Sequence, residues 1–148
     1  MPFTVTPPWA YTLQLPPDPR GPGIARSTLR TVLAAHGMRA LTAVAELLTS
    51  ELVTNAYLHS EGPCTLRLRA MEPGRLRVSV WNGNPEIPPP FRAAGPAVTR
   101  PGEGDEHGRG LLLAELCADD FGAYPLERWG GKLLWAECSG AADAGRGR

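Results

Sequence analysis

The sequence is poor in the patterns that mark secreted or membrane proteins. Its three cysteines, Cys64, Cys117 and Cys138, are odd in number and form no C-x-x-C pair. Scattered cysteines of this kind are typical of reduced, packed thiols rather than of a disulfide framework. The N-terminus has no basic start and no uninterrupted apolar stretch, so no signal peptide is expected. No apolar run approaches membrane-spanning length, so we expect a cytoplasmic protein that makes no membrane contact.

Charge and metal-ligand patterns are equally sparse. Fifteen basic and fifteen acidic residues give a formal net charge of zero, so no long-range field favours nucleic acid as a direct partner. The histidines at positions 36, 59 and 107 have no Cys or carboxylate at metal-ligand spacing, so no zinc site is predicted. The chain has 148 residues and is 43% hydrophobic, which suits a single domain with one core.

The order of periodic segments predicts an α+β fold, with helices covering one face of a mostly antiparallel sheet. The expected elements are a strand at 9–16, a helix at 24–37, a longer helix from Ala40 to Gly62–Pro63, a hairpin at 64–81, a helix from Gly108 to near Gly122, and a strand at 130–138. The periodicity places near one face of the first helix the residues Ile24, Leu29, Val32, Leu33 and His36. Between Asn84 and His107 lies a long Pro- and Gly-rich segment, which is typical of a binding loop.

Polar residues recur on one face of the longer helix. Glu51, Asn55 and His59 are four residues apart and therefore stack beside an apolar row. One interpretation is a solvated helix edge in which Asn55 is a satisfied amide. The other is a site, since an Asn carbonyl is a suitable Mg²⁺ ligand and a neighbouring Glu could accept a proton.

Two further features favour a nucleotide site. "HGRGL" opens the helix at Gly108, and free N–H groups at a helix N-terminus suit a phosphate, although a flexible lead-in explains the glycines equally well. "VWNGNP" places Asn82-Gly83 at a strand end, yet Pro85 and the prolines at 88–90 rule out a returning strand.

These motifs, in this order, resemble the GHKL ATPase superfamily, which includes gyrase, MutL and the histidine kinases. "ELVTNAYLH", "VWNGNP" and "GRGLLLAELCADDFG…GGKLLWAEC" most resemble the small bacterial anti-sigma factor serine kinases of the RsbW type, over about Leu15 to Cys138. The resemblance implies a two-layer α/β sandwich of the Bergerat type. It divides the chain into an N-terminal strand and connector (1–23), an ATP-binding kinase domain (24–138, with an ATP lid at 84–107) and a disordered tail (139–148).

The resemblance also implies roles for individual residues. Glu51 would be the catalytic general base, and Asn55 the ligand of Mg²⁺ that bridges the ATP phosphates. Asn82 and Gly83 would contact adenine, with His59 and Lys132 in supporting positions. The phosphate-binding segment would be Gly108, Arg109, Gly110 and Leu111, and a solvated arginine is an equally good interpretation of Arg109.

The sequence departs from the family on the base side. The family has an Asp where this chain has Asn82, and often a hydroxyl residue where this chain has Lys132 and Leu133. A neutral amide accepts a weaker hydrogen bond than a carboxylate and can also donate one, which predicts roughly tenfold weaker ATP binding or a relaxed base preference.

Three functions therefore stay open at the level of sequence. The first is an ATP- and Mg²⁺-dependent serine/threonine-protein kinase and anti-sigma factor, which phosphorylates a STAS-type antagonist and binds a sigma factor, with a homodimer as a further expectation from the family. The second is a degenerate partner-switching protein with weak or no ATP binding. The third is a GHKL-type ATPase that acts on another target.

Overall fold

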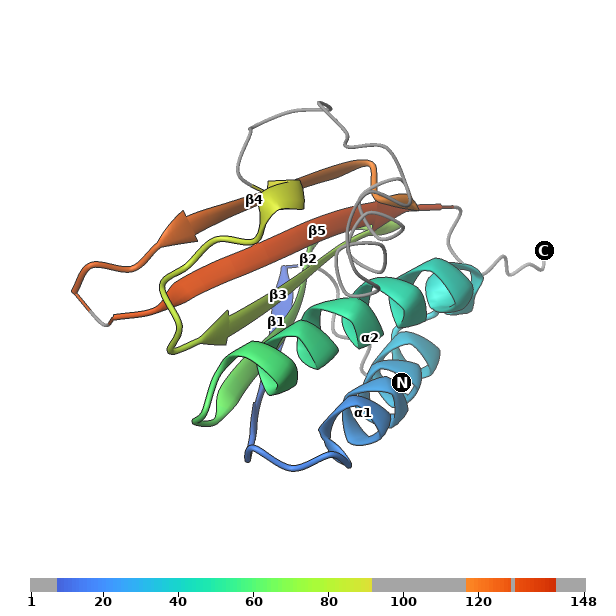
Figure 1. Cartoon of the computed structure of the whole chain (residues 1–148). Coiled ribbons are helices and arrows are strands. Elements are labelled where there is room, and N and C mark those ends of the chain that lie inside the picture. Colours follow the sequence, from blue (N-terminus) through green and yellow to red (C-terminus); the bar gives the residue numbers. More distant parts are fainter. Residues whose placement is uncertain (1–7, 92–116, 129, 141–148) are drawn as a thin grey trace, which may run out of the picture.

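The protein is built on one antiparallel sheet with two long helices packed on one of its faces (Figure 1). The computed structural model describes residues 8–91, 117–128 and 130–140. Within this part of the chain the strand order is β1-β2-β3-β5-β4. The elements are β1 (Trp9–Leu15), α1 (Gly21–Ala35), η1 (Arg39–Leu41), α2 (Thr42–His59), β2 (Cys64–Glu72), β3 (Arg75–Asn82), η2 (Pro89–Phe91), β4 (Asp120–Pro125) and β5 (Lys132–Ser139). This arrangement confirms the predicted α+β fold.

Alternation of side chains explains why the strands form a sheet with two different faces. In β2 the residues Cys64, Leu66 and Leu68 are buried, while the residues between them are not. The register sets Leu66 opposite Val80 and Val80 opposite Leu134, so apolar positions line up across three strands. Because side chains alternate with a period of two, this register fixes which residues face the helices.

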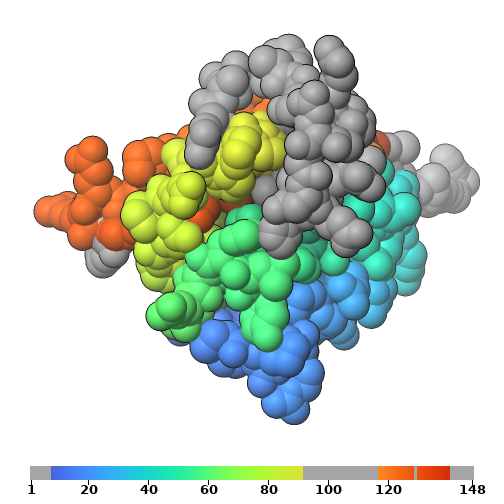
Figure 2. All heavy atoms as spheres, in the orientation of Figure 1, coloured from blue at the N-terminus to red at the C-terminus, as the bar shows by residue number. Residues whose placement is uncertain are grey.

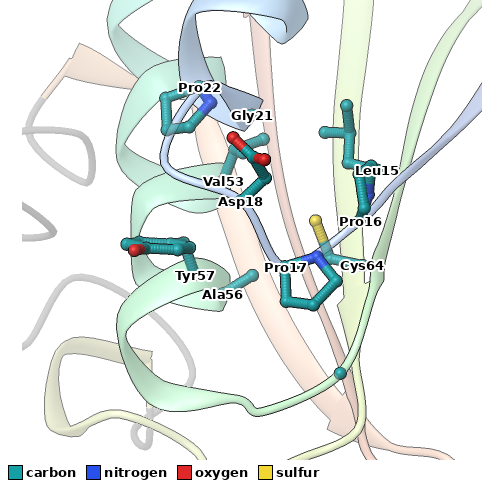
Figure 3. A pocket seen from close by; sticks show the side chains of 11 residues that line it. Leu15, Pro16, Pro17, Asp18, Gly21, Pro22, Val53, Ala56, Tyr57 and Cys64 are labelled. Atoms are coloured by element: carbon teal, nitrogen blue, oxygen red, sulfur yellow. The ribbon is translucent and has the colours of Figure 1, made fainter.

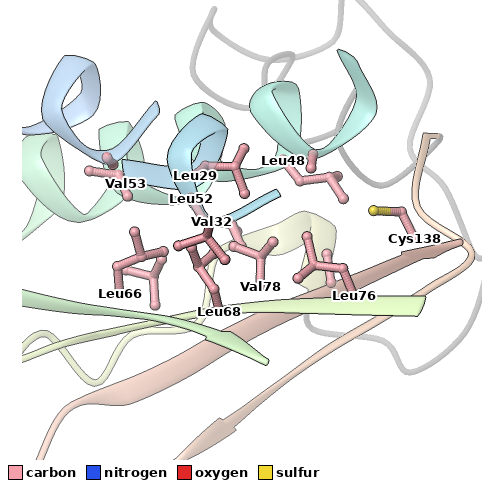
Figure 4. Close-up of a cluster of buried hydrophobic side chains, with 14 of the residues drawn as sticks. Leu29, Val32, Leu48, Leu52, Val53, Leu66, Leu68, Leu76, Val78 and Cys138 are labelled. Carbon is pink, nitrogen blue, oxygen red and sulfur yellow. The ribbon is translucent and has the colours of Figure 1, made fainter. Parts of the chain in front are cut away.

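The core lies between this apolar face and the two helices (Figure 4). Leu52 of α2 and Leu29 of α1 are fully buried there, together with Leu68 and Val78 from the sheet. Helix α1 ends at Ala35, and Gly37 two residues later has a φ of 70°, the left-handed conformation that glycine adopts most readily. The connector is thereby directed towards η1 and α2.

The opposite face of the sheet carries charged residues instead of helices. Glu137 of β5 accepts hydrogen bonds from Arg75 and Arg77 of β3, the latter at 2.7 Å. Arg77 also lies over the ring of Trp135, with 4.0 Å between its guanidinium carbon and the ring centroid. Burial raises the pKa of Glu137, but the two arginines more than offset this, so its pKa lies below the ordinary value.

Three sequence-based expectations about elements are wrong. The helix expected to run to Gly122 has already ended, because β4 begins at Asp120 and pairs with β5. Ile24 does not face the core: its residue is 48% exposed, and Ala25 occupies the buried position instead. Helix α1 begins at Gly21, three residues before the expected start at Ile24.

Other expectations are confirmed or stay open. The strand expected at 9–16 is β1, and the strand expected at 130–138 is β5. Of the tail predicted at 139–148, Ser139 is the last residue of β5 and positions 141–148 lie outside the described residues, so the division into three segments stays a prediction. Across the ranges that the structure covers, no helix combines the length and apolar character needed to cross a membrane.

Candidate functional site

The polar face predicted for the longer helix exists on α2, and burial varies along it. Asn55 is only 6% exposed, Glu51 one turn earlier is half-buried, and His59 at the helix end is exposed. The Asn55 side-chain oxygen is buried and has no hydrogen-bond partner in the described part of the chain. A solvated helix edge does not explain this atom, because buried polar atoms in folded proteins are nearly always paired.

A second polar group lies where β3 ends and β5 begins. Asn82, the last residue of β3, is directly opposite Lys132, the first residue of β5. Each lies two residues along its strand from a core residue, Asn82 from Val80 and Lys132 from Leu134. Because side chains alternate along a strand, both side chains face the helical side of the sheet. Asn82 is 0% and Lys132 1% exposed, which is unusual for a lysine.

The two side chains are hydrogen-bonded to each other. Lys132 Nζ donates to Asn82 Oδ1 at 3.2 Å and to the Asn84 carbonyl oxygen at 2.8 Å. Asn82 Oδ1 also accepts the backbone N–H of Asn84 at 2.8 Å. Asn82 Nδ2 is buried without a hydrogen-bond partner among the described residues. Burial lowers the pKa of Lys132, an effect that the nearby Glu86 carboxylate opposes.

Asn84 connects this strand end to the helix that carries Glu51 and Asn55. Its side-chain Nδ2 donates to the backbone carbonyl of His59, the last residue of α2, at 2.6 Å. Figure 2 shows the C-terminal end of α2 (green) in contact with the segment that follows β3 (yellow-green). The two groups of polar residues therefore belong to neighbouring elements on the same side of the sheet.

Glycines allow the chain to come close at this point. Gly131 has φ +81°, and a Cβ there would collide with the Asn82 carbonyl oxygen and lie 2.9 Å from Gly83 Cα. The start of β5 therefore requires glycine. Gly83 is different, because a Cβ would come no closer than 4.0 Å to Ser60 Oγ and its φ is not left-handed. Nothing in the described fold requires glycine at position 83.

The residues present fit a magnesium ion held jointly with phosphates. Mg²⁺ takes oxygen ligands and is often bound by only one or two protein groups, with phosphates and waters completing the shell. The unpaired Asn55 oxygen offers one such ligand. In the described ranges no group of three or more His, Cys, Asp and Glu side chains could hold a metal ion, so the phosphates would have to supply further ligands.

The phosphate-binding segment predicted from the sequence cannot be placed. Gly108, Arg109, Gly110 and Leu111 lie outside the described residues, as do positions 92–107 of the segment predicted to be a lid. The part that is described, from Asn84 to Phe91, ends in the turn η2. There Phe91 packs edge-on against Phe121 of β4, with ring centroids 5.5 Å apart.

A separate pocket lies on the other side of α2, where the connector after β1 meets the helix (Figure 3). Its lining residues are Leu15, Pro16, Pro17, Asp18, Gly21, Pro22, Val53, Ala56, Tyr57, Gly62 and Cys64. Its carboxylate, Asp18, is already paired with Arg20 at 2.8 Å. None of the residues predicted to bind nucleotide lines this pocket, so it is not the candidate site.

Sequence reasoning missed the role of Asn84 and the pairing of Lys132. Asn84 accepts the N–H of Glu86 and receives Lys132 on its carbonyl, so it holds the whole turn together. The repeated Asn of "NGNP" was an available signal, because Asn side chains often bond to the backbone two residues on. Lys132 had no such signal, since its partner is far away in the sequence.

Comparison with known proteins agrees with this geometry. A family model described as the histidine kinase-like ATPase domain matches residues 15–136, which is most of the chain. No individual curated protein matches significantly. The match includes both the α2 face with Glu51 and Asn55 and the strand pair that carries Asn82 and Lys132. The chain therefore belongs to the histidine kinase-like ATPase domain family.

Proposed function

We propose that this chain is a regulatory protein serine kinase that binds a magnesium nucleoside triphosphate and phosphorylates a partner protein. Family membership supports an ATP-binding regulatory protein. The observation that carries the proposal is the buried, unpaired side-chain oxygen of Asn55, one helical turn after Glu51. A buried acceptor without a partner is expected where a cation completes the site in the bound state.

In this proposal the protein acts mainly by positioning and by moving one proton. Glu51 accepts the proton from the acceptor serine hydroxyl, while the serine oxygen bonds to the γ-phosphorus and the bond from that phosphorus to the bridging oxygen breaks. Asn55 would hold Mg²⁺ through its side-chain oxygen, and the ion would supply charge neutralisation on the phosphate oxygens. The proton passes to Glu51, the phosphoryl group to the serine oxygen, and the nucleoside diphosphate is the leaving group.

The acceptor in this proposal is a STAS-domain anti-sigma-factor antagonist. Phosphorylation of the antagonist releases the kinase, which then binds a sigma factor. Support comes from the resemblance of the motifs around Glu51, Asn82 and Gly131 to small anti-sigma factor kinases. We further propose a cytoplasmic location, since the buried Cys64 and Cys138 are free thiols.

One observation favours a second function, a partner-switching protein that does not depend on nucleotide. Lys132 fills the end of the site where the family's base would be recognised, and it satisfies Asn82 Oδ1 without any ligand. An acceptor that is already paired loses a hydrogen bond when a ligand displaces its partner. Under this alternative the helix face and the strand end would serve only as a binding surface.

Titration of the full chain with nucleotide, with and without Mg²⁺, separates the two functions. The kinase proposal expects saturable, magnesium-dependent binding, which Asn55→Ala should weaken at least about tenfold because the ion loses a ligand. Glu51→Gln should keep nucleotide binding but abolish phosphoserine formation on a STAS-domain substrate, measured by intact mass.

Glu46→Gln is the matched control on the same helix. Glu46 lies more than two turns before Asn55 on α2, so it is remote from that residue. It pairs with Arg30 of α1 at 3.0 Å and is part of a helix–helix contact. The variant should retain both binding and transfer, since a partly exposed ion pair contributes little to stability. Absence of nucleotide binding at millimolar concentration in the wild-type chain would reject the kinase and leave the binding protein.

A further inference from the structure

We propose that the base end of this site selects a purine nucleotide with a carbonyl at C6, so that a guanine or hypoxanthine nucleotide binds tighter than ATP. The inference rests on the proposed nucleotide site and names its substrate class. Asn82 and Lys132, both buried at the paired ends of β3 and β5, are the residues that would make the choice.

The accepting capacity at this end of the site is already used. A side-chain amide oxygen has two lone pairs, and Asn82 Oδ1 receives one donor from the Asn84 backbone and one from Lys132 Nζ. Two donors converging on the same atom also fix the orientation of the amide, since a flip would place its NH₂ group against both of them. The oxygen is therefore not available to a base.

The groups that are left over are donors. Asn82 Nδ2 carries two N–H groups and has no partner in the part of the chain that the structure describes. The Lys132 ammonium has three N–H groups, of which two are directed at Asn82 and Asn84. A buried, unpaired donor is rare in folded proteins, and a ligand acceptor is a sufficient explanation for it.

A set of hydrogen-bond donors without a free acceptor is complementary to guanine or hypoxanthine and not to adenine. A free Asn amide suits adenine, because it can accept from the 6-amino group and donate to N7. Here the amide oxygen of Asn82 already accepts two hydrogen bonds, so the adenine amino group would meet donors only. Guanine and hypoxanthine present O6 and N7, which are both acceptors, and lysine is a common partner of these two atoms. Sites whose hydrogen-bonding groups are left unpaired by the wrong ligand discriminate strongly.

The charges at this end of the site favour the same choice. Where the family it resembles has an acid, this chain has the neutral Asn82, so the Lys132 ammonium meets no carboxylate at that position. An electron-rich carbonyl is favoured beside an ammonium, whereas an amino group is not. Asn82 and Lys132 thus act in the same direction, although they lie 50 residues apart in the sequence.

Calorimetric titration of the full chain with Mg-GTP, Mg-ITP and Mg-ATP tests the inference. We expect GTP and ITP to bind at least about tenfold tighter than ATP, because a mismatched donor leaves buried groups unpaired. ITP lacks the 2-amino group, so similar affinities for ITP and GTP would assign the selection to O6. If ATP binds as tightly as GTP or tighter, the inference fails while the proposed function stands. If none of the three binds, both fail.

Substitutions identify the residues responsible. The double variant Asn82→Asp/Lys132→Thr restores an acceptor and removes the ammonium, and it should reverse the preference to ATP. Lys132→Met keeps the length of the side chain and should lose most of the preference for GTP, which gives a second reading if the double variant is unstable. Arg67→Thr is the matched control, since Arg67 is exposed and lies at a position of β2 with the opposite register parity. Persistence of the GTP preference in both site variants would overturn the assignment.

Discussion

Gly131→Ala tests whether the close approach of β5 to the end of β3 builds the site. Gly131 has φ +81°, and an added Cβ would collide with the carbonyl oxygen of Asn82 and lie 2.9 Å from Gly83 Cα. These are backbone atoms, so no side-chain rotation relieves the contact. The strand ends must separate, and the pairing of Asn82 with Lys132 is the first to be disturbed.

The expected decrease in the free energy of unfolding has two parts. A non-glycine residue in the left-handed region loses roughly 1–2 kcal/mol, of which a reduced unfolded-state entropy returns about 0.5–1 kcal/mol. Opening the end of the ladder adds the loss of one or two hydrogen bonds at about 1 kcal/mol each, together with poorer burial of Lys132. We therefore expect Gly131→Ala to lower the free energy of unfolding by about 3 kcal/mol and to weaken nucleotide binding.

Gly130→Ala provides the control for the backbone conformation. Gly130 has φ +80°, but an added Cβ would meet no atom within 4 Å. Its free energy of unfolding should fall by only about 1 kcal/mol, with nucleotide affinity unchanged. Urea titrations followed by far-UV circular dichroism would measure both variants. Equal losses in the two would show that the approach of Gly131 to Asn82 is not required, and the reasoning about the strand ends would be refuted.

Three further predictions concern stability and thiol reactivity. Glu137→Gln should lower the free energy of unfolding near neutral pH, whereas Glu46→Gln should not. Because the pKa of Glu137 is depressed in the folded state, its contribution to stability is complete above roughly pH 5 and disappears as the pH falls through that lowered pKa. Urea titrations of the wild type and the Glu137→Gln variant should therefore converge in acid. Leu52→Ala, at a fully buried position, should destabilise the chain by about 2–5 kcal/mol in the same assay, and a loss under 1 kcal/mol would contradict its place in the core. Burial raises the pKa of the Cys138 thiol to about 12, so iodoacetamide at pH 8 should label the exposed Cys117 first, as read by peptide mass; rapid labelling of Cys138 in the folded chain would contradict its burial.

Elements with strong local periodicity were predictable from the sequence. The hairpin of β2 and β3 alternates apolar and basic residues, and both strands appear where that alternation predicts them. Helix α2 likewise follows its apolar row, and Glu51 and Asn55 stand on it as predicted. Local pattern suffices in these cases because each strand or helix buries one face against the same core.

Elements whose identity depends on a distant partner were not predictable. β4 is a short edge strand that is mostly unburied, and it forms by pairing with β5 rather than through its own alternation. The exposure of Ile24 follows from how α1 packs on α2, which a periodic pattern in α1 alone does not fix. In both cases the tertiary contact outweighs the local preference.

The sequence by itself determined which chemical groups the candidate site contains: a carboxylate and an amide one turn apart on α2, and an Asn and a Lys at the ends of two strands. Only the tertiary structure decided which atoms of those groups are already occupied. The register of β3 and β5 places Lys132 opposite Asn82, so the amide oxygen is taken and the amide N–H groups are left. Strand register is set by packing across the whole sheet, and so the atom of Asn82 that stays unpaired could not be read from its neighbours in the chain.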